Sequence, residues 1–213
     1  ALSSLITDLT EQAPKLNQFV LEKAIAAMTC AVNHGAEQAD RLAVIDFSLP
    51  STEPRLWIFD LQNRSLILEE LVAHGRNSGG NLATRFSNKE GSHQSSIGLF
   101  RASESYIGRH GYALRMDGLE PGINDRARER AIVIHGADYV NEQWIEKHGR
   151  IGRSHGCPAV NRDVAEQVVD TLKDGQFVFS YYPDDQWLTT SPYLNCQPER
   201  VEAIVALYDS TAN

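Results

Sequence analysis

The order of the apolar runs along the chain restricts its fold more than any other feature. Short runs rich in Val, Ile, Phe and Trp follow one another between residues 42 and 116, with Pro, Asn and Gly between them. Such runs are typical of strands joined by turns. Because few helical segments separate them, the sequence predicts a mostly antiparallel, β-rich α+β domain and not a series of βαβ units.

The positions of the elements follow from the spacing of apolar residues. We expect strands at residues 42–48, 55–61, 65–73, 98–102, 111–116, 131–135 and 176–182. We expect helices at residues 14–33, 161–173 and 198–208. The polar, glycine-bearing stretch 75–95 is expected to be a long loop, and a loop of this length in a compact domain is often functional.

Composition excludes several classes of protein. Of the 213 residues, 42% are hydrophobic and 23% are charged, which is typical of a globular protein. The net charge of −8 and the scattered basic residues argue against nucleic-acid binding. The longest apolar run, residues 24–32, is too short to span a membrane. Since the chain opens with Ala-Leu-Ser-Ser, we expect a signal peptide to have been removed or to lie outside the given sequence.

Three cysteines, Cys30, Cys157 and Cys196, leave at least one thiol free. A Cys30–Cys196 disulfide in an oxidising compartment is one interpretation. A small buried thiol at Cys30 is the other. Cys157 differs from both because glycine and histidine surround it.

Cys157 lies in the segment 152–158, Gly-Arg-Ser-His-Gly-Cys-Pro, and an apolar run upstream ends at His135. Glycine beside the cysteine permits a tight turn and a close approach of a substrate carbonyl. A free thiol has a pKa of about 8.5, so only a small fraction is thiolate at neutral pH. A neighbouring imidazole can take the proton, and backbone N–H groups of the turn at Gly156 and Cys157 would stabilise an oxyanion. The pattern therefore indicates a cysteine nucleophile for acyl transfer on peptide-like substrates.

Other interpretations of these residues remain open. Taken alone, Cys157 is more often a buried structural thiol, and His135 a hydrogen-bonded core histidine. His135, His155 and Cys157 also have the ligand types of a zinc site. No fourth ligand stands at a familiar spacing, so we expect neither a metal nor another cofactor.

Residues 154–157, Ser-His-Gly-Cys, preceded by Ile134-His135-Gly136, resemble the signature of the L,D-transpeptidase (YkuD-type) catalytic domain. Further runs at residues 92–100, 110–112 and 134–140 resemble the murein L,D-transpeptidase branch of that family. The resemblance covers residues 42–182. The spacer between His135 and Ser154 is slightly longer than usual. Pro158 and Ala159 stand where the family often has an apolar residue followed by Asn or Arg, and Arg153 or Asn161 is the expected substitute.

The resemblance implies an L,D-transpeptidase-like sandwich or barrel with flanking N- and C-terminal helices. From this resemblance, together with the helices expected at both ends, we expect a helical extension at residues 1–40, a catalytic domain at 41–185 and a C-terminal helical tail at 186–213. The implied substrate is peptidoglycan, with a stem tetrapeptide as acyl donor and an amine of a neighbouring stem as acceptor. By motif position, Cys157 is the nucleophile and His135 the proton acceptor. The residues expected to shape the oxyanion hole and orient the thiol are Ser154, His155 and Gly156, and those expected to bind substrate are Arg153, Gly136 and Tyr112.

Two other functions, one catalytic and one not, are compatible with the same motif. A hydrolase, either a carboxypeptidase or a cross-link endopeptidase, would pass the acyl group of the thioester to water. A catalytically silent module would only bind the wall. For the leading interpretation we expect a periplasmic or secreted monomer that contacts peptidoglycan stem peptides, with no nucleic-acid partner. The 75–95 loop is expected to be a lid over the cleft.

Overall fold

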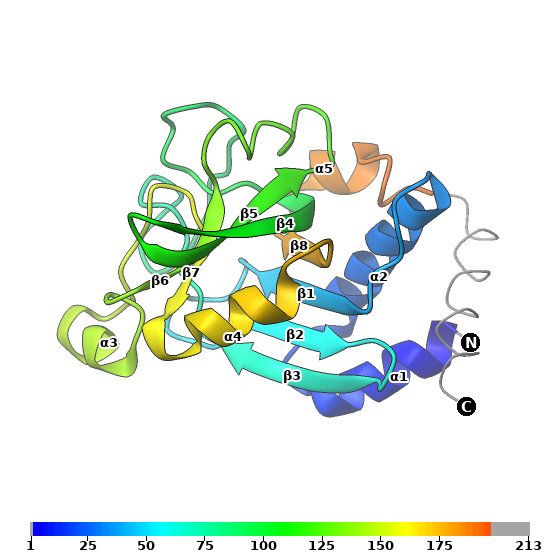
Figure 1. The fold of residues 1–213 in the computed structure, drawn as a ribbon, viewed down its shortest axis with the longest axis horizontal. Helices are drawn as coiled ribbons and strands as arrows, with labels where there is room; N and C mark the ends of the chain where they lie inside the picture. Colours follow the sequence, from blue (N-terminus) through cyan, green and yellow to red (C-terminus); the bar gives the residue numbers. More distant parts are fainter. Residues whose placement is uncertain (1, 197–213) are drawn as a thin grey trace.

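One mixed sheet of eight strands organises residues 2–196, the part of the chain described by this computed structural model (Figure 1). The strands are β1 (Arg41–Asp46), β2 (Leu56–Asp60), β3 (Ser65–Glu70), β4 (Gly98–Gly108), β5 (Gly111–Gly118), β6 (Val133–Ala137), β7 (Ala159–Asn161) and β8 (Phe177–Tyr181). Their order across the sheet is β3-β2-β1-β8-β4-β5-β6-β7. The helices are α1 (Leu2–Gln12), α2 (Gln18–Asn33), α3 (Glu142–His148), α4 (Arg162–Leu172) and α5 (Asp185–Thr190). None of these helices has both the length and the apolar character needed to cross a membrane.

Most neighbouring strands are antiparallel, as predicted, but two pairs are parallel. β1 pairs in parallel with β8, and β6 pairs in parallel with β7. Ala73, which follows β3, forms a bridge with Ala159 of β7. The two ends of the sheet therefore approach each other, and the sheet is nearly closed into a barrel. This closure brings the segment after β3 beside the β6–β7 edge, where the predicted nucleophile lies.

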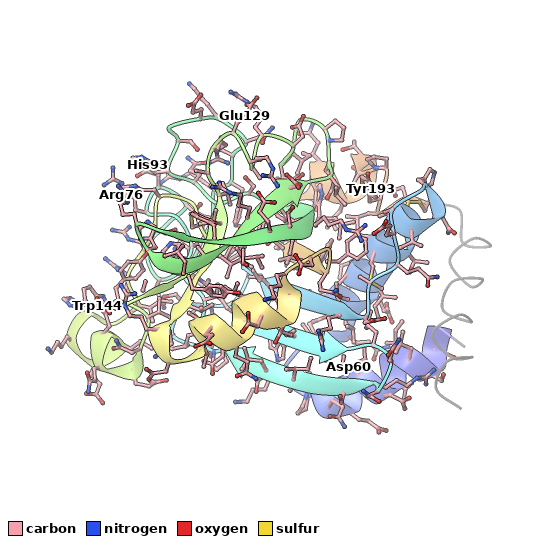
Figure 2. The ribbon with its side chains drawn as sticks, in the orientation of Figure 1. Asp60, Arg76, His93, Glu129, Trp144 and Tyr193 are labelled. Carbon is pink, nitrogen blue, oxygen red and sulfur yellow. A yellow bond between two sulfur atoms is a disulfide. The ribbon has the colours of Figure 1, made fainter. Side chains whose placement is uncertain are left out.

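Apolar residues cover both faces of the central strands. On β1, Leu42 and Val44 belong to the core formed with α1 and α2, whereas Ala43 and Ile45 belong to the core formed with α4. Tyr193, labelled in Figure 2, packs against the first of these cores beyond α5. Because alternate residues of a strand point to opposite faces, a strand buried on both faces is a continuous apolar run in sequence. This is why the strand prediction at residues 42–48 agrees with the structure.

Capping residues determine where two helices begin. The helix predicted at residues 14–33 begins at Gln18, because the side chain of Asn17 accepts the N–H of Phe19. Asn161 caps α4 in the same way by accepting the N–H of Asp163. The spacing of apolar residues does not predict α1, α3, α5 or β7, although α1 and most of α5 lie in the segments expected to be helical extensions. The helix predicted at residues 198–208 lies outside the described residues.

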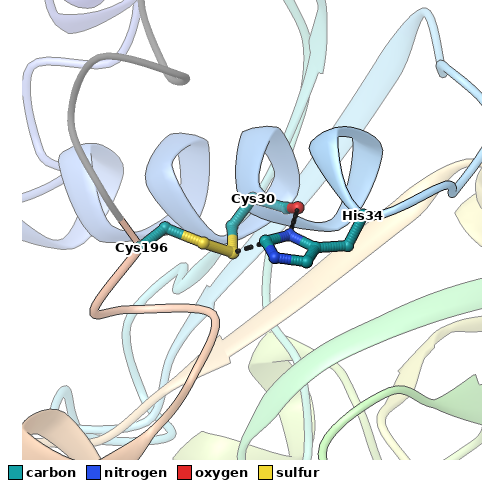
Figure 3. A group of neighbouring side chains, drawn as sticks. All are labelled: Cys30, His34 and Cys196. Atoms are coloured by element: carbon teal, nitrogen blue, oxygen red, sulfur yellow. Dashed lines mark hydrogen bonds between the residues drawn. A yellow bond between two sulfur atoms is a disulfide. The ribbon is translucent and has the colours of Figure 1, made fainter.

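A disulfide joins Cys30 of α2 to Cys196, the last residue that the structure describes (Figure 3). The ring of His34 lies beside it, with Nδ1 2.8 Å from the Cys30 carbonyl oxygen and 3.7 Å from Cys30 Sγ. Two cysteines and a histidine are also a metal-binding combination. Here, however, the sulfurs are bonded to each other and Nδ1–H donates to the carbonyl, so these atoms are not free to bind an ion. Of the two interpretations of Cys30, the structure has the disulfide.

Candidate active site

A cavity of about 390 Å³ opens where the β4–β5 hairpin meets the segments before β6 and β7. Its lining comprises Tyr106, Arg109 and His110 of the hairpin, residues 130–133 and His135 around β6, Tyr139, residues 153–155 and Cys157. Figure 2 shows His93 and Arg76, which lie near this cavity, at the opposite end of the molecule from α1. The cavity brings together five of the predicted site residues, namely His135, Arg153, Ser154, His155 and Cys157.

Cys157 is positioned by the parallel pairing of β6 and β7, which places it beside the start of β6. Its Sγ accepts the N–H of Val133 at 3.4 Å, and its S–H donates to the carbonyl of Ala131 at 3.5 Å. Burial raises the pKa of the thiol, while the Val133 N–H and the charges of Arg130 and Arg109 act in the opposite direction. The thiol is therefore neutral in this geometry and is held against the strand.

The turn that carries Cys157 depends on Ser154 and Gly156. Ser154 Oγ donates to the Cys157 carbonyl at 2.6 Å and accepts the Gly156 N–H at 3.1 Å. Gly156 has a φ of 122°, and a Cβ at this position would lie 2.8 Å from the Gln94 carbonyl oxygen. Ser95 Oγ donates to the Gly156 carbonyl at 3.2 Å from the other side. The expected use of the Gly156 N–H in an oxyanion hole conflicts with this geometry, because Ser154 already accepts it.

His135 lies on β6 with its side chain buried. Its Nδ1 is 2.9 Å from the Gly136 carbonyl oxygen, so Nδ1 carries the proton and Nε2 has the free lone pair. Its ring stacks on that of His110, with ring centroids 4.1 Å apart. Burial lowers the pKa of His135, and the charges of the neighbouring His110, Arg162 and Arg109 lower it further, while the hydrogen bond to Gly136 raises it. Among the described residues, no hydrogen bond joins this imidazole to Cys157 Sγ, although both side chains line the cavity.

His155 lies on the rim of the cavity and is exposed. Its ring stacks on that of His93, with centroids 4.3 Å apart, and the Arg76 guanidinium donates to His93 Nδ1 at 2.8 Å. Desolvation and the charges of these two neighbours lower the pKa of His155. His155 is therefore part of the cavity wall, whereas the hydrogen bonds of Cys157 Sγ go to the backbone of Val133 and Ala131.

The three residues expected to bind substrate are placed differently. Arg153 lines the cavity, and its guanidinium donates to the carbonyls of Arg76 and Gly79 at 3.1 and 3.0 Å. Tyr112 and Gly136 do not line it. The Tyr112 hydroxyl donates to Asp170 of α4 at 2.6 Å, and Gly136 faces α4 so closely that a Cβ there would lie 2.9 Å from Ala165 Cβ. These two positions support α4 and are not part of the cavity.

The charge of the cavity is opposite to that of the whole chain. Of residues 2–196, three arginines line it, Arg109, Arg130 and Arg153, and no Asp or Glu does. The chain as a whole has a net charge of −8. A concave site with several cations and no carboxylate attracts anionic ligands.

Comparison with known protein families shows which family the chain belongs to. Residues 12–181 match the model of the L,D-transpeptidase catalytic domain. The chain belongs to this family. A search among curated proteins gave no significant match.

Solved structures that are similar to this L,D-transpeptidase domain are distant from it in sequence. An L,D-transpeptidase from Mycobacterium smegmatis is 15% identical, with a TM-score of 0.41 over 68% of this chain and 59% of that chain. The helical cell shape determining protein Pgp2 from Campylobacter jejuni is 12% identical, with a TM-score of 0.43 over 87% and 62%. Bd1075 from Bdellovibrio bacteriovorus is 15% identical, with a TM-score of 0.40 over 81% and 56%. The matched region covers less than two thirds of the length of each of these proteins.

The zinc alternative is not supported by the side chains of the L,D-transpeptidase domain. Among residues 2–196, the group of metal-ligand side chains whose ligand atoms converge is Cys30, His34 and Cys196, and not the set His135, His155 and Cys157. His135 and His155 each stack on a different histidine, His110 and His93. The chemistry of this cavity is therefore that of a thiol, imidazoles and guanidinium groups.

Arg109, His110 and Arg130 line the cavity but do not follow from the sequence argument. Arg109 and His110 form the tip of the β4–β5 hairpin, between Gly108 and Gly111. Two glycines around a two-residue turn are a hairpin signal, and this signal would have placed both side chains at the end of the sheet. Arg130 lies in an irregular segment, and no spacing rule connects it to Cys157.

Proposed function

We propose that this domain forms a thioester between Cys157 and the acyl group of a peptidoglycan stem tetrapeptide, and transfers that group to an amine of a neighbouring stem. One observation carries the proposal: the free thiol of Cys157 and the imidazole of His135 line the same cavity. A thiol beside an imidazole in a concave site is the arrangement that cysteine-dependent acyl transfer requires.

Activation of the thiol begins with its release from Ala131. Rotation about the Cα–Cβ bond of Cys157 takes the sulfur away from the Ala131 carbonyl and into the cavity. The free lone pair of His135 is on Nε2, because Nδ1–H donates to the Gly136 carbonyl. The S–H proton then passes to Nε2 and leaves a thiolate beside an imidazolium. Burial lowers the pKa of His135, which keeps the imidazole neutral and able to accept this proton at neutral pH.

The acyl transfer has two steps. The thiolate attacks the carbonyl carbon of the donor amide, the C–N bond breaks, and the leaving amine takes the proton from the His135 imidazolium. The acceptor amine then attacks the thioester carbonyl, gives a proton to His135, and releases Cys157, which regains its proton. With water in place of the acceptor amine, the same steps give hydrolysis.

The N–H of Cys157 is our candidate donor to the oxyanion. Within residues 2–196 it has no hydrogen-bond partner, whereas the N–H of Gly156 donates to Ser154 Oγ. Ser154 thus fixes the turn and leaves the next N–H of the chain for the substrate. A single backbone donor in such a position is worth about 3 kcal/mol of transition-state stabilisation.

The cationic lining of the cavity supports an anionic, carboxylate-bearing substrate. Arg109 extends from the hairpin tip, and among the described residues it forms no ion pair with an acidic side chain. Arg153 also lines the cavity, where its guanidinium donates to two backbone carbonyls. Peptidoglycan stem peptides carry free carboxylates, and an arginine can bind a carboxylate through two parallel hydrogen bonds.

The proposed substrate also indicates the compartment in which the protein acts. Peptidoglycan lies outside the cytoplasmic membrane, so we propose that the protein acts in the periplasm or as a secreted monomer. The Cys30–Cys196 disulfide supports this, because disulfides persist in oxidising compartments.

The proposal is tested by intact-mass analysis after incubation with purified muropeptides. We expect an acyl adduct on the protein and cross-linked dimers among the products, both lost in Cys157→Ala. His135→Gln should reduce the rate by roughly 100-fold or more while leaving the fold intact, since a general base contributes at least this much.

Other outcomes separate the alternatives. Trimmed stems without dimers would show that water is the acceptor. No product, together with no Cys157 adduct from a thiol-reactive carbapenem, would refute the enzymatic proposal and favour a silent module that binds the wall.

A further inference from the structure

Arg130 makes four hydrogen bonds, and each goes to a neutral acceptor. Nη1 donates to the Ser87 carbonyl at 2.7 Å and to Ser96 Oγ at 2.8 Å. Nη2 donates to Ser92 Oγ at 3.1 Å and to the Gln94 carbonyl at 2.7 Å. The guanidinium therefore fastens the segment 87–96, the end of the loop expected to be a lid, to the residues that lead into β6.

The charge of Arg130 is not compensated by any carboxylate among residues 2–196. Its neighbours in the same segment behave differently: Arg126 pairs with Glu129, and Arg128 pairs with both Glu104 and Asp117. Arg130 is half-buried, and burial of an unpaired cation is unfavourable unless an anion stabilises it. The four neutral acceptors bind the guanidinium but leave its charge uncompensated, so an anion that forms beside it would be stabilised.

Cys157 is the group that can supply this anion. Both residues line the cavity, and a Cβ added to Gly156 would lie 3.5 Å from Arg130 Nη2. The next residue, Ala131, provides the carbonyl that accepts the Cys157 S–H. Burial raises the pKa of Cys157, and the charge of Arg130 opposes that increase. The guanidinium thus lies beside the turn formed by Gly156 and Cys157, on the side of the turn that faces the 87–96 segment.

We propose that Arg130 is a positioning residue for Cys157, which holds the 87–96 segment against the Gly156–Cys157 turn and directs its unpaired positive charge toward the Cys157 thiolate. This inference rests on the proposed function for its biological meaning, but it can be tested on the thiol alone. The proposal also connects the 87–96 segment with the Gly156–Cys157 turn. When Arg130 is hydrogen-bonded to this segment, its charge lies beside the turn and stabilises the thiolate.

The test is the pH dependence of Cys157 alkylation by iodoacetamide, followed by intact-mass analysis of the folded chain with Cys30 and Cys196 joined. Arg130→Met removes the charge and the hydrogen bonds. Arg130→Lys keeps the charge and loses most of the hydrogen bonds. Arg128→Met removes an arginine from the same segment whose charge is already paired, and it is the matched control.

We expect Arg130→Met to raise the apparent pKa of Cys157 by roughly one unit, so that alkylation near neutral pH slows roughly tenfold while the plateau rate at high pH is retained. Arg130→Lys should keep most of the wild-type profile and show faster hydrogen exchange in residues 87–96. Arg128→Met should leave both the alkylation profile and the hydrogen exchange of residues 87–96 unchanged. If Arg130→Met does not fold, as judged by circular dichroism, the Arg130→Lys profile and exchange decide.

The inference is overturned if the profile of Arg130→Met coincides with that of the wild type, if Arg128→Met shifts the profile equally, or if Arg130→Lys leaves exchange in the 87–96 segment unchanged. Loss of muropeptide transfer alone does not bear on it, because alkylation requires no substrate. If Arg130→Met shifts the alkylation profile but the wild type transfers no muropeptide, the role of Arg130 is confirmed and the proposed reaction is refuted.

Discussion

At the scale of single residues, Gly156 shows how narrowly the conformation of the turn that carries Cys157 is specified. Its φ of 122° is a conformation that side chains with a Cβ rarely adopt, and the backbone of Gln94 and the side chain of Ile132 leave no space for one. Ser154 accepts the N–H of Gly156, and Ser95 donates to the carbonyl of the same residue. The position of Cys157 is thus the result of contacts made by its neighbours.

We expect Gly156→Ala to displace Cys157 and to slow acyl transfer by roughly 100-fold, because a shift of about 1 Å in a reacting group has an effect of this order. The free energy of unfolding should fall by about 1–3 kcal/mol because of the backbone strain. Gly149→Ala is the control: Gly149 also has a positive φ, 73°, but no atom lies within 4 Å of an added Cβ. Equal transfer rates in the two variants, measured on muropeptides, would contradict this account of the turn.

A second pair of residues, Arg55 and His74, holds the start of the loop that follows β3. Arg55 is completely buried and its Nη2 donates to His74 Nδ1 at 2.8 Å. His74 Nε2–H donates in turn to the Gly80 carbonyl at 2.9 Å. The backbone carbonyl of His74 accepts the N–H of Ser154 at 3.0 Å. The neutral form of His74 therefore connects the buried sheet to the cavity wall.

Acid should weaken this connection. Burial and the charge of Arg55 lower the pKa of His74 to about 4, below its value in the unfolded chain. The unfolded chain therefore binds a proton more readily than the folded one between pH 6.5 and 4. The stability due to neutral His74 is complete above this window and is lost as the pH falls through it, by about 3 kcal/mol in total.

The measurement is urea unfolding at a series of pH values. His74→Gln should be less stable than the wild type at pH 7 and should lack the component that titrates between pH 6.5 and 4. His148→Gln removes an exposed histidine of α3 and should keep that component. If the wild type and His74→Gln lose stability in parallel across this window, the depressed pKa of His74 is wrong.

At the scale of elements, one buried carboxylate fixes α5 to the sheet. Glu120 is 1% exposed. Its Oε2 accepts the N–H of Leu99 at 2.6 Å, and its Oε1 accepts the Trp187 indole N–H at 3.0 Å and the Ser191 hydroxyl at 2.5 Å. A helix as short as α5 is not stable alone in water, so this anchor and the burial of Trp187 keep it in place.

Replacing Glu120 with Gln should lower the free energy of unfolding by about 2 kcal/mol, because the amide NH2 would face hydrogen-bond donors in a buried site. Urea unfolding followed by tryptophan fluorescence measures this directly. Glu129→Gln, an exposed change in a surface ion pair, should alter stability by less than about 0.5 kcal/mol. A loss for Glu120→Gln as small as that of Glu129→Gln would show that the carboxylate does not anchor α5.

The elements also show what sequence reasoning can predict and where it fails. Strands such as β1 are predictable because both faces are buried. Helix α3 is not, since none of its residues is buried and it has no apolar periodicity. Its real signals are local, the cap Asn141 and the left-handed Gly149.

The candidate site divides in the same way. Cys157 and His135 follow from two short sequence motifs, at residues 154–157 and 134–136. The glycines around Arg109 signal a hairpin tip, but that Arg109 and Arg130 both line the cavity depends on how the hairpin and the 118–132 segment fold back toward β6, which no local spacing encodes. Tyr112 was predicted at the site because its run resembles the family, and its side chain instead contacts α4.

At the scale of the whole molecule, the disulfide and the cavity lie at opposite ends. Figure 2 shows Tyr193, three residues before Cys196, far along the sheet from His93 and Arg76, which adjoin the cavity. The disulfide closes a loop between residues 166 positions apart in sequence. A cross-link that spans so much of the chain restricts the unfolded state strongly and, being remote from the cavity, should affect stability and not chemistry.

Removing this cross-link should therefore lower stability without changing the activity of the folded molecules. We expect Cys30→Ala/Cys196→Ala to lose about 3 kcal/mol, equivalent to a decrease in melting temperature of roughly 6–12 °C. Calorimetry with and without reductant checks this, because reductant should shift the melting temperature of the wild type to that of the double variant and leave the double variant unchanged.

Thiol exchange with Cys157 is avoided by making the stability measurements in a Cys157→Ala background. Transfer rates are then compared in proteins that retain Cys157, at a temperature where both are folded. A rate that falls together with stability would show that the α2 end of the molecule is coupled to the cavity, and that the 87–96 segment is not the only structure that controls the thiol.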